Sequence, residues 1–278
     1  MLTDQQRAKA ATLRLLQDDD VLVLPNAWDA ASAALIAAGG ARAIATTSAG
    51  VSWSLGRPDG QNLTRAEMID AVSRIAASVD LPVSADVEGG YGPDTDDVAR
   101  TVTAVIEAGA VGINLEDSRA PGGPLFEPQE QDARIRAARE AASAAGLPGL
   151  VVNARTDVYL SGIGPEAGRL DDVVARARSY AAAGADSLFV PGLLDLGTLS
   201  ELTSRVDLPV NVMAGPGAPS VDELRAAGVR RVSVGQAIAQ AAYSLARRAA
   251  VEALGKGTFD SLADADPFGD VNGAFRAR

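Results

Sequence analysis

Short apolar runs alternate with longer alanine-rich stretches along almost the whole chain. The short runs have the length and residue types of buried strands, and the longer stretches, dotted with Arg and Glu, have those of helices. A chain that alternates strand and helix forms a parallel sheet, because each helix returns the chain to the same edge of the sheet. Eight runs fit a strand: 21–25, 42–47, 82–87, 112–116, 149–155, 187–192, 209–214 and 231–235. Each is mostly apolar, as expected for a strand that is covered on both faces.

The connections that precede these strands also alternate. Before the second, fourth, sixth and eighth runs the helix ends in an Ala-Gly pattern, as in EAGAVG and AAGADS, where glycine supplies a left-handed cap. Before the third, fifth and seventh runs the chain reads x-Leu-Pro, as in VDLPVS, and proline both stops a helix and suits the first position of a strand. Eight strand–helix units with this paired pattern predict a (β/α)8 TIM barrel. An eight-stranded doubly wound open sheet is the alternative.

We expect a single barrel domain over residues 1–278, since a chain of 278 residues has the usual length of such a barrel. Residues 1–20 are predicted to form a leading helix, and residues 235–278 the last helix and a C-terminal tail. The segment 117–127 is a long polar insertion directly after the fourth strand.

Composition excludes several kinds of chemistry. The chain has no cysteine and no histidine, which rules out a thiolate nucleophile, a Ser-His-Asp triad and a zinc site of cysteine type. Its only lysines, Lys9 and Lys256, lie near the two ends, so we do not expect a Schiff-base lysine. A net charge of −11 disfavours nucleic acid and anionic membranes as partners. Without a membrane-length apolar run or a signal-peptide pattern, we expect a cytoplasmic protein.

Acidic residues follow neighbouring strands of the predicted barrel. Asp86 lies at the end of the third strand and Glu88 directly after it, and Glu116 ends the fourth. The carboxyl ends of barrel strands meet in one mouth, where several carboxylates repel one another unless a cation lies between them. In a chain without histidine or cysteine, the fitting ion is a hard one such as Mg²⁺ or Mn²⁺. The alternative is that these acids cap a helix or pair with Arg155.

Groups suited to an anionic substrate lie at the same mouth. Arg155, in the fifth strand, offers a planar fork for a carboxylate or phosphonate, unless it only forms a structural ion pair with Glu116 or Asp157. The small-residue turn Thr47-Ser48-Ala49 can present backbone N–H groups to an anionic oxygen. Trp28 after the first strand and Asn211 in the seventh are further candidates for substrate binding.

Several ordered motifs resemble those of the isocitrate lyase/phosphoenolpyruvate mutase superfamily over nearly the whole chain. They are LPNAWDAASA, TTSAGVSWSLGRPDG, SADVEGGYG, GINLEDS and VNARTD. The resemblance implies a (β/α)8 barrel whose eighth helix is often swapped between the subunits of a dimer or tetramer. It also implies a Mg²⁺-bound 2-oxo acid and chemistry through a pyruvate-like enolate.

The resemblance assigns roles to individual residues. Asp86 corresponds to the direct metal ligand, and three further acids commonly hold the ion through water: Asp59, Glu88 and Glu116. Thr47, Ser48 and Ala49 correspond to the turn that binds the substrate carboxylate, and Arg155 to the arginine that contacts the substrate's oxygens. Arg155, Glu116 and Ser48 are the predicted catalytic residues.

The loop after the fourth strand departs from the family pattern. The lyase branch carries K-[KR]-C-G-H there and the mutase branch carries Lys and Asn, whereas this chain reads SRAPGGPLFEP. We therefore expect a Mg²⁺-dependent lyase that acts on a small 2-oxo acid by oxaloacetate-type decarboxylation or a related C–C cleavage. The alternatives are phosphonopyruvate hydrolysis or phosphoenolpyruvate rearrangement, and a non-catalytic 2-oxo-acid binder. We also expect a homo-oligomer.

Overall fold

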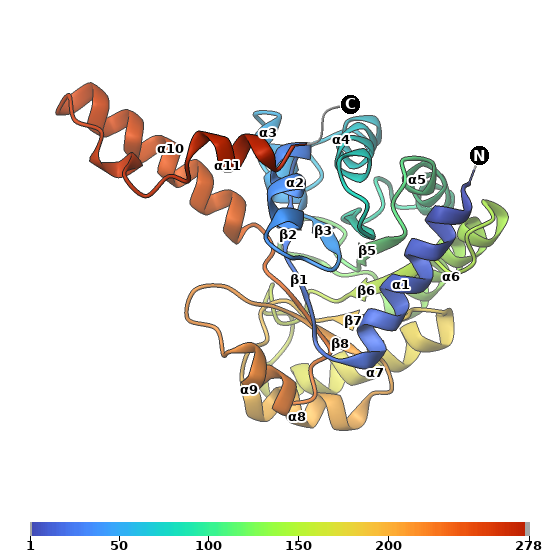
Figure 1. Cartoon of the computed structure of the whole chain (residues 1–278). Helices are drawn as coiled ribbons and strands as arrows, with labels where there is room; N and C mark the ends of the chain where they lie inside the picture. Colours follow the sequence, from blue (N-terminus) through green and yellow to red (C-terminus); the bar gives the residue numbers. More distant parts are fainter. Residues whose placement is uncertain (1, 276–278) are drawn as a thin grey trace.

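The computed structural model describes residues 2–275 and contains one parallel sheet. The strands are β1 (Leu22–Leu24), β2 (Asn26–Ala27), β3 (Ile44–Thr46), β4 (Val83–Asp86), β5 (Gly112–Glu116), β6 (Val151–Arg155), β7 (Ser187–Phe189), β8 (Val210–Met213) and β9 (Arg231–Ser233). Their order is β1-β9-β8-β7-β6-β5-β4-β3-β2. Because β1 and β2 are consecutive in the chain, the two ends of this order meet and the sheet curls into a nearly closed barrel (Figure 1).

Pro25 divides the first predicted strand into two short pieces. The piece before it, β1, pairs with β9, and the piece after it, β2, pairs with β3. The Asn26 side chain joins the two sides, since its Nδ2 donates to the carbonyl of Thr46 (2.8 Å) and its Oδ1 accepts from the amide of Val234 (2.9 Å). The prediction of a (β/α)8 barrel is confirmed, and the open doubly wound sheet is wrong.

Helices surround the barrel and connect its strands (Figure 1). They are α1 (Asp4–Asp19), α2 (Ala30–Ala38), α3 (Ser48–Ser54), α4 (Arg65–Ser78), α5 (Thr95–Glu107), α6 (Pro128–Ala144), α7 (Arg169–Ala183), α8 (Leu196–Arg205), α9 (Val221–Ala226), α10 (Ala237–Gly255) and α11 (Phe268–Gly273). Several begin with a capping box, such as Thr64 with Glu67 at α4 and Ser220 with Glu223 at α9. These reciprocal hydrogen bonds fix where each helix starts and hence where the preceding loop ends.

The hydrophobic core lies between the strands and the helices. Ile113 and Leu115 of β5 are fully buried, as are Ile75 of α4 and Ile135 of α6. Successive strand residues point to opposite faces, so the residues between these apolar ones face the inside of the barrel. There the side chains are polar: Ser84, Asn114, Asn153 and Asn211. The interior thus differs from the apolar packing that the strand runs predicted.

Helix α1 accounts for the expected leading helix and packs against the barrel. Its Leu13 is fully buried, and the Nε of Arg14 donates to the carbonyl of Gly149 just before β6 (3.1 Å). At the other end of the chain, α10 projects away from the barrel, and α11 runs back towards the barrel (Figure 1). The last part of the predicted tail, residues 276–278, lies outside the described residues. Over residues 2–275 we find no helix with the length and apolar character to cross a membrane.

Candidate active site

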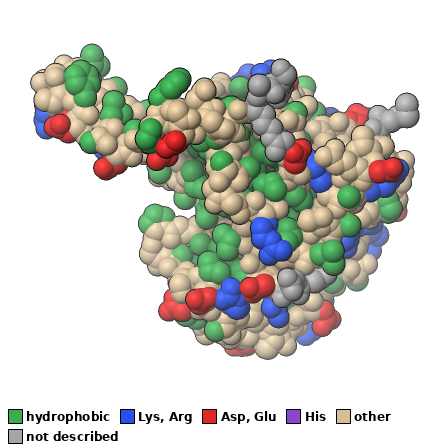
Figure 2. All heavy atoms as spheres, viewed as in Figure 1, with side chains coloured by type: hydrophobic (Ala, Val, Ile, Leu, Met, Phe, Trp, Pro, Cys, Tyr) green, Lys and Arg blue, Asp and Glu red, His purple; other side chains and the backbone are tan. Residues whose placement is uncertain are grey.

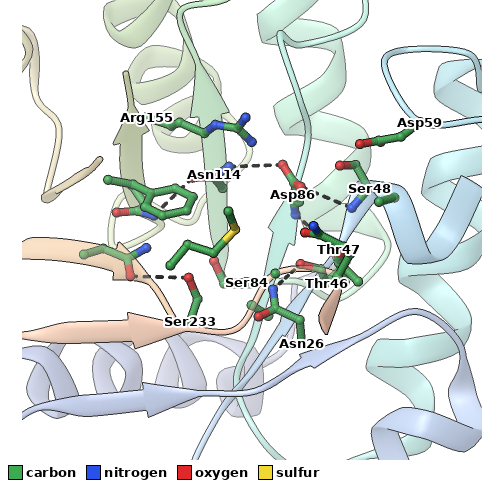
Figure 3. Close-up of a pocket in the computed structure, with 18 of the residues that line it drawn as sticks. Asn26, Thr46, Thr47, Ser48, Asp59, Ser84, Asp86, Asn114, Arg155 and Ser233 are labelled. Carbon is green, nitrogen blue, oxygen red and sulfur yellow. Dashed lines mark hydrogen bonds between the residues drawn. The ribbon is translucent and has the colours of Figure 1, made fainter. Parts of the chain in front are cut away.

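A cavity of about 220 Å³ opens at the carboxyl ends of the strands (Figure 3). Residues from strands around the barrel line it, so it is built by the sheet and not by one loop. The lining includes Asn26, Thr46, Thr47, Ser48, Ala49, Trp53, Asp59, Ser84, Asp86, Asn114, Asn153, Arg155, Leu160, Phe189, Asn211, Met213, Arg231, Ser233, Gly235 and Gln236.

Most of the predicted site residues line this cavity. They are Asp59, Asp86, Arg155, Asn211 and the turn Thr47–Ala49. Glu88 and Glu116 lie behind the lining and are buried. Trp28 is not among the residues that line the cavity. Its ring instead lies near α10, with its centroid 6.1 Å from that of the Tyr243 ring. The chemical roles given to all these residues stay predictions.

Asp86, the last residue of β4, is held by hydrogen bonds from three sides. Its Oδ2 accepts from the amide of Ser48 (3.2 Å), and its Oδ1 accepts from Nδ2 of Asn114 (3.1 Å) and from the amide of Glu88 (3.3 Å). Asn114 in turn accepts from Nδ2 of Asn153 (3.1 Å), which accepts from the hydroxyl of Ser187 (2.7 Å). This chain of polar side chains crosses four strands, so it orients the Asp86 carboxylate from inside the barrel.

Glu88 lies in a strained and buried corner beside Asp86. Its carboxylate accepts hydrogen bonds from the amide of Gln61 and the hydroxyl of Tyr91 (2.9 Å). All three residues have positive φ, between 48° and 59°, a conformation that non-glycine residues seldom adopt. Burial and then the negative charge of Asp86 raise the pKa of Glu88 to about 7. The pKa of Asp59 is also raised, first by burial and then by Asp86.

Arg155, the last residue of β6, is fixed by two carboxylates. Its Nη1 lies 2.9 Å from Glu116, and its Nε and Nη2 form a fork on Asp157 at 2.6 and 3.0 Å. Burial lowers the pKa of Arg155, but the charges of Glu116 and Asp157 outweigh burial and the net pKa is raised. Burial raises the pKa of Glu116 well above its usual range, against the opposing effect of Arg155. The guanidinium therefore stays charged and rigid at the edge of the cavity.

The small-residue turn offers fewer free donors than its sequence predicted. The amide of Thr47 donates to the carbonyl of Ala27 (3.1 Å), and that of Ser48 donates to Asp86. Among the described residues, the amide of Ala49 has no protein acceptor. Of the three predicted donors, Ala49 alone is thus available to a ligand without rearrangement.

The donor set at this edge suits a hard cation. Within the described part of the chain, no three metal-ligating side chains converge to hold an ion by themselves. Two carboxylates, Asp59 and Asp86, do face the cavity, and their mutual repulsion is the kind that a cation relieves. Mg²⁺ commonly keeps several waters and takes only one or two protein carboxylates. The residues therefore fit Mg²⁺ held by Asp86 and Asp59, with Glu88 and Glu116 farther back.

The insertion 117–127 packs across the loop that carries Asp59. A Cβ on Gly60 would lie 2.5 Å from Cγ of Pro121, so these two loops are in close contact. At the base of the insertion, Asp117 is fully buried and accepts from the hydroxyl of Tyr180 (2.8 Å) and Nη1 of Arg176 (3.2 Å). The insertion is therefore anchored to α7.

Several cavity residues were not predicted from the sequence, among them Ser84, Asn114, Phe189, Met213, Arg231 and Ser233. A signal for some of them was present. Ser84 stands two residues before Asp86, and Asn114 two residues before Glu116. With a side-chain period of two, each must point to the same side of the sheet as the acid that follows it.

Comparison with known proteins gives consistent results. The family model for phosphoenolpyruvate phosphomutase matches residues 13–254. Oxaloacetate decarboxylase 2 of Pseudomonas fluorescens (strain Pf0-1) is 35% identical over 208 residues, which cover 72% of this chain and 67% of that protein. The 2-methylisocitrate lyase of Escherichia coli (strain K12) is 31% identical over 227 residues, 77% of this chain and 73% of that protein. The structure of oxaloacetate acetylhydrolase in complex with the product oxalate aligns with a TM-score of 0.84 and 26% identity, and the alignment covers 96% of this chain and 94% of that one.

Proposed function

The chain belongs to the isocitrate lyase/phosphoenolpyruvate mutase superfamily of lyases and mutases, and we propose that it is a Mg²⁺-dependent lyase acting on a small 2-oxo acid. The proposed reaction is decarboxylation of the oxaloacetate type or a related C–C cleavage through an enolate. The observation that carries the proposal is the arrangement of Asp86, Asp59 and Arg155 around one cavity.

The metal and the arginine, both positively charged, would act on the oxygens of the substrate. Mg²⁺ held by Asp86 and Asp59 would supply Lewis acidity toward the oxygens of the 2-oxo acid. Arg155 presents a fixed positive charge to the oxygen on which charge develops as the C–C bond breaks. Because Glu116 and Asp157 already hold the guanidinium in place, little reorganisation is needed in the transition state. The amide of Ala49 is placed to bind the substrate carboxylate.

The composition of the insertion favours decarboxylation over the other reactions of the relatives. Residues 117–127 contain no cysteine and no lysine, so they provide neither a thiol nor an ammonium group as a proton donor. Departure of CO₂ requires no proton on the leaving group. The similarity to oxaloacetate decarboxylase 2 supports the same reaction.

Phosphorus–carbon chemistry is the second candidate, because the family model that matches is that of phosphoenolpyruvate phosphomutase. Phosphonopyruvate and oxaloacetate both carry an anion on C3 of a pyruvate unit. A cavity that polarises this unit can therefore release either group, and the leaving group must be identified by experiment.

Parallel assays test the proposal. Purified protein with Mg²⁺ is given oxaloacetate, phosphonopyruvate or 2-methylisocitrate, and pyruvate, CO₂, phosphate and succinate are measured. We expect pyruvate and CO₂ from oxaloacetate, well above the rate of the Asp86→Ala variant at the same Mg²⁺ concentration, which controls for non-enzymatic decay. Turnover of phosphonopyruvate alone would replace our proposal with the second candidate. Tight Mg²⁺-dependent binding of pyruvate without any turnover would indicate a binding protein.

A homo-oligomer is part of the proposal. Large apolar side chains are exposed on the projecting C-terminal arm, residues 237–275: Leu254 is 89% exposed, Phe268 84% and Phe259 68%. Figure 2 shows hydrophobic side chains along this arm. Exposed apolar surface of this extent usually marks a protein interface. We expect light scattering to give the mass of a dimer or larger assembly; a monomer at micromolar concentration would contradict this.

A further inference from the structure

Arg231 is a buried cation at the inner end of the active-site cavity. It is the first residue of β9, its side chain is 2% exposed, and it lines the same cavity as Asp86 and Arg155. Across the sheet it pairs in register with Asn211 of β8. The insides of such barrels are ordinarily filled by branched apolar side chains, so a guanidinium there is unusual.

The guanidinium of Arg231 has almost no partner within the protein. Its Nη2 lies 3.5 Å from the hydroxyl of Ser84, at the outer limit of a hydrogen bond, and its Nε and Nη1 have no acceptor among the described residues. The side-chain nitrogen of Asn211 likewise has none. Buried donors without acceptors cost free energy and are rare in native proteins. We call Ser84, Asn211 and Arg231 the floor of the cavity.

The charge of Arg231 is equally uncompensated. Over the described residues it forms no ion pair, and burial alone lowers its pKa to about 10, so it remains protonated at neutral pH. Another fully buried arginine, Arg134, shows how this chain satisfies such a group elsewhere. Arg134 donates to the carbonyls of Gly89, Gly92 and Pro93 and lies 4.1 Å from the centroid of the Phe126 ring.

The floor lies below the proposed metal site and within the same cavity. Ser84 precedes Asp86 by two residues on β4, a rise of about 7 Å along a strand. Figure 3 shows Ser84 and Ser233 on the side of the cavity away from Asp59 and Arg155. A ligand that meets Asp86 and Arg155 at the mouth can therefore extend toward Arg231.

We propose that the floor is a binding subsite for a second acidic group of the substrate, a carboxylate about 7 Å from the part bound at Asp86. The inference rests on the proposed function at the mouth and specifies its substrate class: oxaloacetates that carry on C3 a side chain ending in a further carboxylate. Loss of the C3 carboxylate as CO₂ then leaves a 2-oxo dicarboxylic acid of about five or six carbons, whose second carboxylate stays on the floor. Oxaloacetate itself lacks this side chain and occupies the mouth alone.

The acidic group on the floor remains on a product and is not the group released. An arginine that bound the departing carboxylate would stabilise the substrate more than the transition state, and so would slow its loss. Held away from the reacting carbon, the same ion pair instead orients the substrate. The floor thus sets specificity and does not take part in bond breaking.

Binding measured by calorimetry in the presence of Mg²⁺ tests the subsite with two ligands of equal length. 2-Oxoglutarate has a second carboxylate, and 2-oxopentanoate has a methyl group in its place. We expect the wild-type protein to bind the diacid at least about 30-fold more tightly, as for a buried charge-assisted pair. In Arg231→Met this ratio should fall to near one. Arg230→Met removes the same charge from the exposed neighbouring position and should keep the ratio.

A stability measurement separates a binding role from a structural one. Arg231 is buried without a charge partner, so Arg231→Met should raise the melting temperature of the ligand-free protein. A lower melting temperature together with an unchanged binding ratio would assign Arg231 a structural role and overturn the proposal.

Competition with sulfate tests whether the floor binds a carboxylate of the substrate or a free inorganic anion. Sulfate should weaken binding of 2-oxoglutarate to the wild-type protein and leave binding of 2-oxopentanoate unaffected. Sulfate that binds together with the diacid would mean that the floor holds a free inorganic anion, against our proposal. Equal binding of the two acids would reject the subsite while leaving the proposed function intact. If neither acid nor pyruvate binds with Mg²⁺, the proposed function fails and this inference fails with it.

Discussion

Replacing Glu88 with glutamine should make the stability of the metal-free protein less dependent on pH. The Glu88 side chain is nearly fully buried, and its two oxygens accept from the amide of Gln61 and the hydroxyl of Tyr91. Burial and the charge of Asp86 raise its pKa from the ordinary 4.5 to about 7. Between pH 4.5 and about pH 7, Glu88 is therefore mostly protonated in the folded protein and mostly ionised in the unfolded chain.

The sign and size of the effect follow from this difference. A carboxyl with a raised pKa in the folded state stabilises the fold below pH 4.5, and this stabilisation is lost as the pH rises to about 7. At about 1.4 kcal/mol for each pH unit, the loss amounts to about 3 kcal/mol. Glutamine has no charge to bury, and its amide can both accept from Gln61 and donate to the Tyr91 oxygen. Glu88→Gln should therefore match the wild type near pH 4.5 and exceed its stability above pH 7.

Urea denaturation of both proteins with a chelator present, from pH 4.5 to pH 8, measures this difference directly. Other buried acids such as Asp117 titrate in both proteins, so subtracting the two curves isolates Glu88. A cation beside Asp86 favours the ionised form of Glu88, so added Mg²⁺ should stabilise the wild type most at high pH. Parallel stability curves for the two proteins across this range would refute the assigned burial and coupling of Glu88.

Three further substitutions have specific expected outcomes. Asp86→Ala should abolish Mg²⁺ binding by calorimetry and reduce decarboxylation to background. Its unfolding free energy should stay within about 1 to 2 kcal/mol of the wild type, because the carboxylate oxygens lose only the hydrogen bonds from Ser48, Asn114 and the Glu88 amide. Arg155→Lys should lower kcat/KM for oxaloacetate by roughly 100-fold, because lysine cannot form the planar fork. A decrease in kcat/KM of less than about tenfold would argue against a contact between Arg155 and the developing charge. Tyr180→Phe, which removes the hydroxyl donor to buried Asp117, should lower stability in urea by about 2 kcal/mol, and no change would mean that this hydrogen bond is dispensable.

The barrel could be predicted from the sequence because its signal is local and repeated. Ala-Gly and Leu-Pro connections mark the ends of successive helices, and each strand run is short and rich in Val, Ile and Leu. The break at Pro25 was also visible in principle, since proline has no N–H to donate within a sheet. That each half of the broken strand pairs with a different neighbour depends on how the barrel closes, which no local pattern contains.

The site was harder to predict below its mouth. Recognisable motifs contain Asp59, Asp86 and Arg155, and the structure brings these three residues to one cavity. Ser84 and Arg231 lie 147 positions apart in the chain, and only the closed barrel brings them together. Their strands appeared apolar because the outward residues are apolar, and that pattern hid the polar side chains that alternate with them.

Trp28 shows the same dependence on distant contacts. It follows the first strand next to recognisable motif residues, which made it a candidate for substrate binding. In the structure its ring lies near Tyr243 of α10, and Trp53 lies near the same tyrosine from the cavity side. The sequence could not indicate this contact, because it depends on where the last helix leaves the barrel.

A crystal structure grown with Mg²⁺ and oxalate, a stable mimic of the 2-oxo acid unit, is the most direct test of the central claim that this cavity binds such a unit on a cation. We predict an ion against the Asp86 carboxylate, with oxalate oxygens on that ion and within hydrogen-bonding distance of Arg155 and the Ala49 amide. If both ligands are absent from the cavity at saturating concentration, and the Asp86 oxygens still accept only from Ser48, Asn114 and Glu88 as they do here, the claim is contradicted.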